Sequence, residues 1–302
     1  MYITSDGKTR LYYVIPKDNL TLELQLNLNE DTELDIDWGD GSEHTSWTSS
    51  DGDSSKSHEY SDGGRYTVAI TVISGGFSFN SSGDDDYSLK KVELGSSVTE
   101  IEENAFQNCF SLTSITIPSS VTSIGSWAFY ECYALTSITI PNGVTSIRDY
   151  AFDSCYALTS ITIPNLVGSI RKNAFAYCYA LSSITIPNSI TEIGDKAFFN
   201  CHALSSITIP NSITEIGDDA FSNCYALTSI TIPSGVISIG EYAFQNCSAL
   251  ASITFEPTTP PTLGDDLELP TTCIIRVPQE TLEDYTSENY YPSPEDYIYE
   301  EY

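Results

Sequence analysis

The chain has 302 residues, of which 42 are Asp or Glu and only 12 are Lys or Arg, so its net charge at pH 7 is -30. Such a charge repels nucleic-acid phosphates and anionic membrane surfaces, which argues against both as partners. No run of 18 apolar residues occurs, so we expect no membrane insertion. A length of this size allows two domains or one elongated domain.

Residues 1–77 are expected to form a small antiparallel β-sandwich. Apolar and polar residues alternate over 20–28, as in a strand with one buried face. Three further stretches, 11–15, 34–38 and 66–73, also have strand composition, and Gly, Asp and Ser clusters separate them. Several short strands of this kind are typical of a sandwich.

Three motifs in this region resemble those of PKD-type immunoglobulin-like domains. They are Asp-Trp-Gly-Asp-Gly-Ser at 37–42, His-Glu-Tyr at 58–60 and Gly-Arg-Tyr-Thr-Val at 64–68. The resemblance implies a spacer or binding module on a surface protein. Residues 78–88, which contain three consecutive Asp, are polar and are expected to be a linker.

A 23-residue block repeats without slippage from 89 to 257. Each copy begins with a Leu and carries a Cys at a fixed position. Seven copies begin at Leu89, Leu112, Leu135, Leu158, Leu181, Leu204 and Leu227, and a degraded eighth copy begins at Leu250. This period, with an LxxIxI core, is typical of a leucine-rich-repeat solenoid in which each copy makes one coil.

The block beginning at Leu204 shows what one coil is expected to do. Its apolar residues Leu204, Ile207 and Ile209 alternate with Ser206 and Thr208, which predicts a strand of a parallel sheet that ends at Pro210. A second apolar pair follows, and Asp218 is expected to cap a short helical turn. The residue before this cap is Gly in four copies but Glu102, Arg148 and Arg171 in three, so a left-handed backbone is not required there.

We therefore expect a mainly β protein: a leucine-rich-repeat solenoid with a parallel sheet and short helical turns, preceded by the small antiparallel sandwich. Seven of the eight Cys occupy one repeat position and point the same way inside the stack. Parallel side chains meet disulfide geometry poorly, so we predict a reduced packing ladder. Disulfides between neighbouring coils are the alternative.

The repeats resemble the BspA-like leucine-rich-repeat family, whose pattern is LxxIxIPxxVxxIgxxAFxxC. The match extends over 89–255, and the TPPTL and CIIRVPQETLEDY stretches resemble the usual carboxyl-terminal ending of that family. The resemblance implies a surface or secreted protein that acts in adhesion and partner binding.

Residues 258–302 are expected to form a carboxyl-terminal cap and an acidic, Tyr-rich tail. The apolar stretch at 274–277 predicts one last strand. Residues 285–302 leave two alternatives open, a short docking helix and a frayed tail.

No catalytic motif is present, so we expect a non-enzymatic protein without a cofactor. The three His residues lie at His44, His58 and His202, and none belongs to a triad or metal-binding pattern. Asp35, Asp37 and Asp40 offer carboxylate oxygens of the kind that Ca²⁺ prefers. Their loop lacks EF-hand spacing, which favours a solvated turn and no metal site.

We predict an extracellular or cell-surface interaction protein that binds a protein or glycan through its solenoid. The alternatives are a phage or prophage virion component, since the first residues of the sequence do not have the pattern of a signal sequence, and a hydroxyl array that orders ice. An aromatic column is the expected binding surface, because such rings form interface hot spots and sugar platforms. Its members are Phe110, Tyr133, Tyr156, Tyr179, His202 and Tyr225, with Trp127 nearby.

Overall fold

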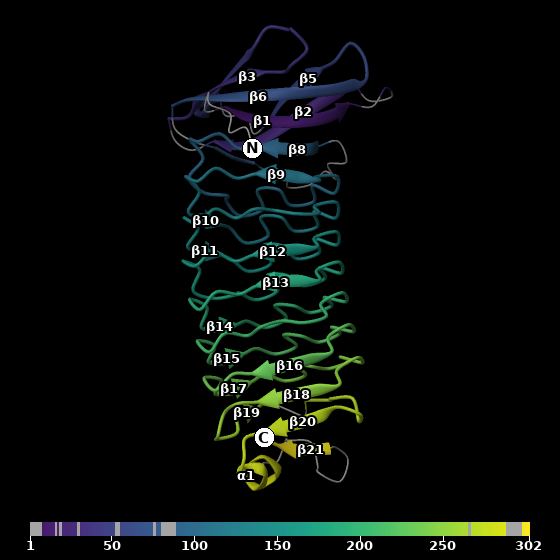
Figure 1. The fold of residues 1–302 in the computed structure, drawn as a ribbon. Coiled ribbons are helices and arrows are strands. Elements are labelled where there is room, and N and C mark those ends of the chain that lie inside the picture. Colours follow the sequence, from purple (N-terminus) through teal and green to yellow (C-terminus); the bar gives the residue numbers. More distant parts are fainter. Residues whose placement is uncertain are drawn as a thin grey trace.

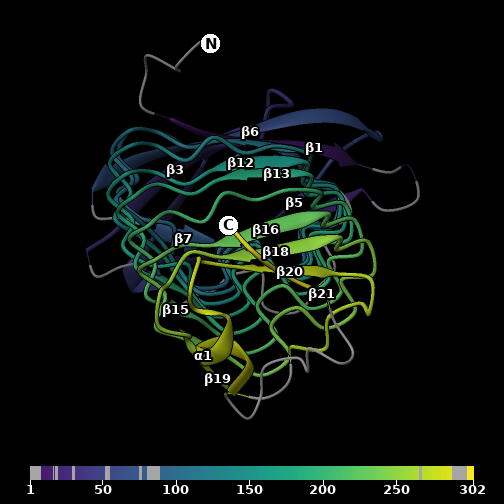
Figure 2. The same cartoon turned by 60° about the horizontal axis from the view of Figure 1, so that its bottom comes forward.

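A computed structural model describes residues 8–15, 17, 20–28, 31–51, 55–74, 77–79, 89–264, 267–287 and 298–302. Antiparallel strands lie at one end, and the coils of the solenoid stack in a line beyond them (Figure 1). Figure 2 shows the stack from the carboxyl-terminal end, where α1 (Leu282–Ser287) lies. The expected mainly β solenoid behind a small antiparallel region is therefore confirmed.

The amino-terminal region contains two antiparallel sheets around a shared core. Its strands are β1 (Thr9–Ile15), β2 (Thr21–Leu28), β3 (Glu33–Asp37), β4 (Thr45–Thr48), β5 (Ser55–Glu59), β6 (Gly64–Ser74) and β7 (Phe77–Phe79). One sheet contains β4-β3-β6-β1, and the other has the order β5-β2-β7. All four stretches predicted as strands form strands. The sequence pattern did not predict the short, polar strands β4 and β5 or the three-residue β7.

Of the two amino-terminal sheets, the one that contains β1 continues directly into the solenoid. β8 (Leu89–Glu93) pairs antiparallel with β1 on one side and parallel with β9 (Ser114–Thr116) on the other. Residues 78 and 79 of the expected linker belong to β7, and residues 80–88 lie outside the described residues. Because β1 covers the free edge of the first coil, the amino-terminal region caps the solenoid.

Two sides of the solenoid carry parallel strands that pair in steps of 23 residues. The first side contains β9, β12 (Ser160–Thr162), β13 (Ser183–Thr185), β16 (Ser229–Ile232) and β18 (Ser252–Phe255). The second side contains β10 (Ser123–Ile124), β11 (Ser146–Ile147), β14 (Glu192–Ile193), β15 (Glu215–Ile216) and β17 (Ser238–Ile239). Equivalent repeat positions face each other, such as Ile161 and Ile184. The predicted parallel sheet is thus present, in several segments.

The third side of each coil, where we expected a short helical turn, is a run of β-turns. Ser222 and Cys224 donate backbone hydrogen bonds to carbonyl groups three residues earlier. Phe221 and Asn223, which alternate with them, donate instead to the following coil. Two residues of the run, Asp219 and Asn223, are left-handed, with φ of 54° and 62°. Every second N–H thereby joins the ladder between coils, whereas a helix would keep all of them within one coil.

The interior of the solenoid contains a column of stacked phenylalanines, which we call the inner column. Its members are Phe106, Phe129, Phe152, Phe175, Phe198, Phe221 and Phe244. Successive ring centroids lie 5.2 to 5.7 Å apart. Their planes are nearly parallel, so each coil covers the ring of the one before it.

The cysteine ladder runs beside the inner column, and all eight Cys are free and buried. The Cys132 thiol donates to the carbonyl oxygen of Phe106 at 3.2 Å, and the same bond recurs in the following coils. Burial raises the pKa of the Cys132 thiol well above its usual range. The predicted reduced ladder is confirmed, and its thiols act as small apolar residues that also donate a weak hydrogen bond.

The carboxyl-terminal segment covers the last coil. Its elements are β19 (Thr262–Leu263), β20 (Ile274–Val277), α1 and β21 (Ile298–Glu301). β20 is the predicted last strand, and β21 extends the sheet beyond it, which the sequence did not indicate. In α1, Tyr285 is fully buried and its hydroxyl donates to the Pro257 carbonyl at 2.6 Å. Of the two alternatives for the tail, the described part contains the docking helix. No described helix is long and apolar enough to cross a membrane.

Candidate interaction surface

The predicted aromatic column lies at the corner where the turns of each coil end and the next strand of the first side begins. We call Phe110, Tyr133, Tyr156, Tyr179, His202 and Tyr225 the outer column. Backbone hydrogen bonds hold the middle of the column on both sides of the ring-bearing residues Tyr156, Tyr179 and His202. Tyr179 donates its N–H to Tyr177 within the coil, and the next residue, Ala180, donates to Tyr156 in the preceding coil. These bonds hold the three rings over their neighbours.

The six rings form one uninterrupted stack. Adjacent centroids are separated by 4.4 to 4.8 Å from Phe110 to Tyr225. The first four contacts are stacked, and the last, between His202 and Tyr225, is tilted by 32°. The structure therefore brings together all six residues that the repeat spacing placed in one column.

The outer column is partly open to solvent. Tyr179 is 36 % exposed and Tyr225 is 45 % exposed, whereas the other members are half-buried. Since each ring covers the face of the next, the column presents ring edges and polar ring atoms rather than ring faces. The end at Tyr225 differs, because the next repeat position is Ser248 and has no ring to stack.

The column is a neutral stripe on a strongly acidic protein. Burial lowers the pKa of His202, so its imidazole is uncharged at pH 7. Burial also raises the pKa of Tyr133, and hydrogen bonding and charge from Glu131 add to this shift. Burial likewise raises the pKa of Tyr179. The phenols of Tyr133 and Tyr179 therefore remain protonated, and each offers both a donor and an acceptor.

Trp127, which we expected near the column, lies in another one. Its ring stacks on Tyr150 at 5.2 Å, and both residues occupy the repeat position just before the Ala-Phe pair. Trp127 is also left-handed, with φ of 53°. The sequence spacing distinguishes these columns, since Trp127 stands six positions before Tyr133 in its coil.

A family model of the BspA type leucine rich repeat region matches residues 80–179 and 168–265. The chain belongs to this family. A comparison with curated protein sequences gives no match. The BspA-type match ends before α1 and begins after β7, so the amino-terminal sheets and the terminal helix lie outside it.

Three solved structures are similar to this BspA-type chain. A leucine rich cell surface protein from Faecalibacterium prausnitzii is 35 % identical, with a TM-score of 0.41 over 55 % of this chain. The chain covers 60 % of that protein's length. The Treponema (T. pallidum) leucine rich repeat protein is 31 % identical, with a TM-score of 0.46 over 53 % of this chain and 77 % of that one. The pneumococcal vaccine antigen PcpA is 18 % identical, with a TM-score of 0.43, and 70 % of this chain and 68 % of that one are covered.

Outside the BspA-type match, the residues that resemble PKD motifs form one packed cluster. The ring of His58 stacks on Trp38 at 5.0 Å and meets the edge of Tyr60 at 4.7 Å. The Tyr60 hydroxyl donates to the Trp38 carbonyl at 3.1 Å. Gly39 is left-handed, and a Cβ there would lie 2.3 Å from the Thr67 carbonyl oxygen, so this turn requires glycine. The motif residues thus hold the loop in place.

The Asp-rich loop pairs with histidines. His44 lies 2.9 Å from an oxygen of Asp35 and 3.6 Å from one of Asp37. His58 lies 2.7 Å from Asp40, and bonding to Ser42 and His58 lowers the pKa of that carboxyl to about 2. Among the described residues, no group of three or more His, Cys, Asp or Glu side chains is arranged to hold a metal ion.

The thiols of the described residues and the imidazole of His202 are held in packing contacts. The thiols of the described chain are buried, and burial raises the pKa of Cys155 and Cys178, which disfavours the reactive thiolate. His202 stacks between two tyrosines. The geometry of the outer column is therefore suited to contact rather than to acid-base or nucleophilic chemistry.

One feature of the second side was not predicted as a site. A cavity opens between two coils beside Arg148 and Arg171, where three repeat positions depart from their usual residues. The sequence feature that could have indicated the cavity is the pair of arginines, because both occupy a repeat position that is glycine in four coils.

Proposed function

We propose that the protein is a non-enzymatic, extracellular or cell-surface interaction protein whose outer column binds a protein partner. The observation that carries this proposal is the continuous, partly exposed aromatic stack from Phe110 to Tyr225. Aromatic side chains add contact area at small entropic cost and are enriched among interface hot spots. The resemblance of 37–42 to PKD motifs supports an additional spacer or binding module in front of the solenoid.

The stacking favours a protein over a glycan at this column. Sugars bind aromatic platforms through open ring faces, and here neighbouring rings cover those faces at 4.4 to 4.8 Å. The exposed edges and hydroxyl groups of the tyrosines suit a mixed apolar and hydrogen-bonding protein surface. The neutral column, surrounded by acidic coils, also directs a partner to one stripe of the molecule.

The proposal is tested by displaying the full chain to an array of purified extracellular proteins and to an array of glycans. We expect a protein to bind. Replacing both Tyr156 and Tyr179 by Ala should weaken its binding at least tenfold, about 1.4 kcal/mol, with unchanged circular dichroism.

The matched control is the double variant Tyr150→Ala and Tyr242→Ala, which removes two tyrosines from a different column of the same solenoid. Its affinity should equal that of the parent chain. Equal loss in the two double variants would exclude the outer column as the site. A glycan that depends on Tyr156 and Tyr179 would show that the partner class is wrong.

A further inference from the structure

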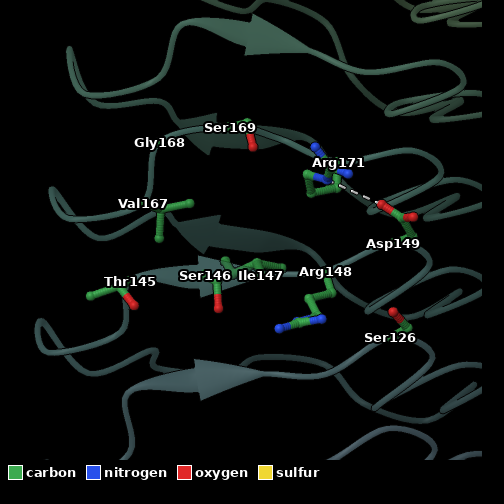
Figure 3. A pocket seen from close by; sticks show the side chains of 10 residues that line it. All are labelled: Ser126, Thr145, Ser146, Ile147, Arg148, Asp149, Val167, Gly168, Ser169 and Arg171. Carbon is green, nitrogen blue, oxygen red and sulfur yellow. Dashed lines mark hydrogen bonds and ion pairs between the residues drawn. The ribbon is translucent and has the colours of Figure 1, made fainter.

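A cavity of about 270 Å³ lies on the second side of the solenoid, away from the outer column. It opens between the coil that begins at Leu135 and the coil that begins at Leu158. Arg148, Asp149 and Ser146 line it from the first of these coils, and Gly168, Ser169 and Arg171 line it from the second (Figure 3). We call it the arginine groove.

The groove coincides with a break in the ladder between coils. Thr145 donates its N–H to Thr122 in the preceding coil at 2.9 Å, and Thr191 donates to Gly168 at 3.0 Å. No hydrogen bond joins Gly168 to Thr145, or Arg171 to Ile147, in this fully described stretch. The parallel pairing also stops after β11 and resumes with the bridge from Ile170 to Ile193. The N–H groups of Gly168 and Arg171 are therefore left for a ligand or water.

Three departures from the usual repeat residues coincide in the second coil, at Leu166, Gly168 and Arg171. In three other coils a Ser hydroxyl donates to the preceding coil, as Ser189 does to Val167 at 2.6 Å, but Leu166 occupies this position here. A Thr hydroxyl makes a second such bond, as Thr191 does to Gly168 at 3.3 Å. Gly168 itself has no hydroxyl, so both side-chain bonds to the preceding coil are lost.

The coil that begins at Leu227 also lacks both hydroxyls, at Gly235 and Ile237, but it has glycine at the position of Arg171 and keeps its backbone bond from Ile237 to Thr214 at 2.9 Å. The combination of all three departures therefore distinguishes the coil at the groove.

After Leu166 and Gly168, the third residue that departs from the usual repeat is Arg171, which replaces the common glycine. Its counterpart Gly217 approaches the preceding coil so closely that an added Cβ would lie 2.5 Å from the Asp195 nitrogen. Arg171 brings a full side chain to this position. At Gly168, by contrast, an added Cβ would meet no atom within 4 Å, which shows how open the coils are here. The inner column continues unbroken past this point, with Phe152 and Phe175 5.5 Å apart, so the gap is confined to the second side.

The groove gathers positive charge and hydrogen-bond donors in a protein of net charge -30. Two of only 12 Lys and Arg residues line it. Arg148 is exposed and has no ion-pair partner in the described chain, whereas Arg171 Nε lies 3.3 Å from an oxygen of Asp149. An arginine fork binds carboxylates in a bidentate manner. The hydroxyls of Ser146 and Ser169 can both donate and accept, and the Asp149 carboxylate can accept from a ligand hydroxyl.

We propose that the arginine groove binds one carboxylate-bearing sugar residue of the uronic acid class. Arg148 pairs with the carboxylate, while Asp149 and the serine hydroxyls bind the ring hydroxyl groups. The volume is at the small end of ligand pockets, which span roughly 300 to 1,000 Å³, and therefore suits a single ring. This site is separate from the outer column, so its occupant is independent of the protein partner proposed above.

The test titrates the full chain with glucuronate, glucose and inorganic sulfate and measures saturable binding by NMR. We expect glucuronate to bind at least tenfold more tightly than either glucose or sulfate. The double variant R148Q/R171Q should lose at least tenfold in glucuronate affinity. The control K196Q/R276Q removes the same charge from Lys196 and Arg276, which pair with Asp219 and Glu300 elsewhere on the solenoid. It should bind as the parent chain does.

A second variant tests the gap without removing Arg148. The triple change L166S/G168T/R171G restores the usual repeat residues, so it should rejoin the two coils, abolish glucuronate binding and raise the melting temperature. The proposal fails if glucuronate does not saturate the parent chain. Equal binding of sulfate would reduce the groove to a simple anion site and overturn the sugar assignment, and equal loss in the control would reduce it to non-specific charge.

Discussion

The inner and outer columns arise from the same 23-residue spacing, but they differ in how much variation they accept. The inner column is Phe in all seven coils, and every ring is fully buried. The outer column contains Phe, Tyr and His, and two of its rings are more than one-third exposed. Ring separations are similar, at 5.2 to 5.7 Å and 4.4 to 4.8 Å. Stacking alone therefore does not distinguish a structural column from a recognition surface.

Solvent on one side explains the difference. A buried ring must fill a fixed volume, because interiors are packed as densely as organic crystals and tolerate neither gaps nor excess. A ring at the surface keeps its stacked neighbours but faces water along one edge, so a phenol or an imidazole fits as well as Phe. The outer column can thus change its chemistry from coil to coil, as recognition requires.

The largest effect should follow from truncating a ring of the inner column. Phe175→Ala removes a fully buried side chain from between Phe152 and Phe198. We expect the free energy of unfolding to fall by about 3 to 5 kcal/mol, because the change loses apolar burial and leaves a cavity. Urea denaturation followed by circular dichroism measures this loss. A loss under about 1 kcal/mol would mean that the coils collapse around the gap and that the column is not rigid.

The sequence predicts the inner column and the path of each coil because both depend on a strict local period. The Leu, Ile, Phe and Cys positions of the block are buried in nearly every coil. The sequence pattern did not predict β21, since Ile298–Glu301 pairs with β20 through contacts distant in the sequence. The helical turn was expected from Asp218 as its cap. The bonds between coils determine the β-turns, and one block considered alone does not contain those bonds.

The candidate surface likewise has features that the repeat spacing predicts and features that it does not. Repeat spacing placed the six rings of the outer column correctly, because a shared period is enough to align them. The spacing also assigns Trp127 to a different column, but it does not show how far apart the two columns lie, since that depends on how the turns fold. It also did not indicate that Gly168 and Arg171 open a groove, which follows from hydrogen bonds lost between two particular coils.

An effect of intermediate size concerns a carboxyl group beside the inner column. Asp153 follows Phe152 and is 4 % exposed, with hydrogen bonds from Ser154 at 2.8 Å and Asn173 at 3.4 Å. Burial raises its pKa to about 6 from an ordinary value of 3.8. The folded protein therefore binds this proton more tightly than the unfolded chain does. Its contribution to stability is greatest below about pH 4 and falls as the pH rises to about 6.

Asp153→Asn removes this pH dependence while keeping a side chain that accepts a hydrogen bond. Relative to the parent chain, we expect the variant to gain about 2 to 3 kcal/mol between pH 4 and pH 7, since one unit of pKa corresponds to about 1.4 kcal/mol. Urea denaturation at the two pH values measures the difference. The D149N variant is the control and should follow the parent chain. A pH-independent difference for D153N would contradict a raised pKa.

The smallest effect on stability should come from the outer column. Tyr179 is exposed over 36 % of its surface and stacks between Tyr156 and His202. Tyr179→Ala gives up two stacking contacts and part of the buried ring area, but water can fill the space that the ring leaves. We expect a loss of about 1 kcal/mol in the free energy of unfolding, several times smaller than for Phe175→Ala in the same coil. Tyr179→Phe keeps the stack and removes only the hydroxyl, so its stability should match that of the parent chain. The same urea titration measures all three variants. If Tyr179→Ala were as destabilising as Phe175→Ala, the outer rings would be part of the core, and the structural reason for assigning recognition to them would disappear.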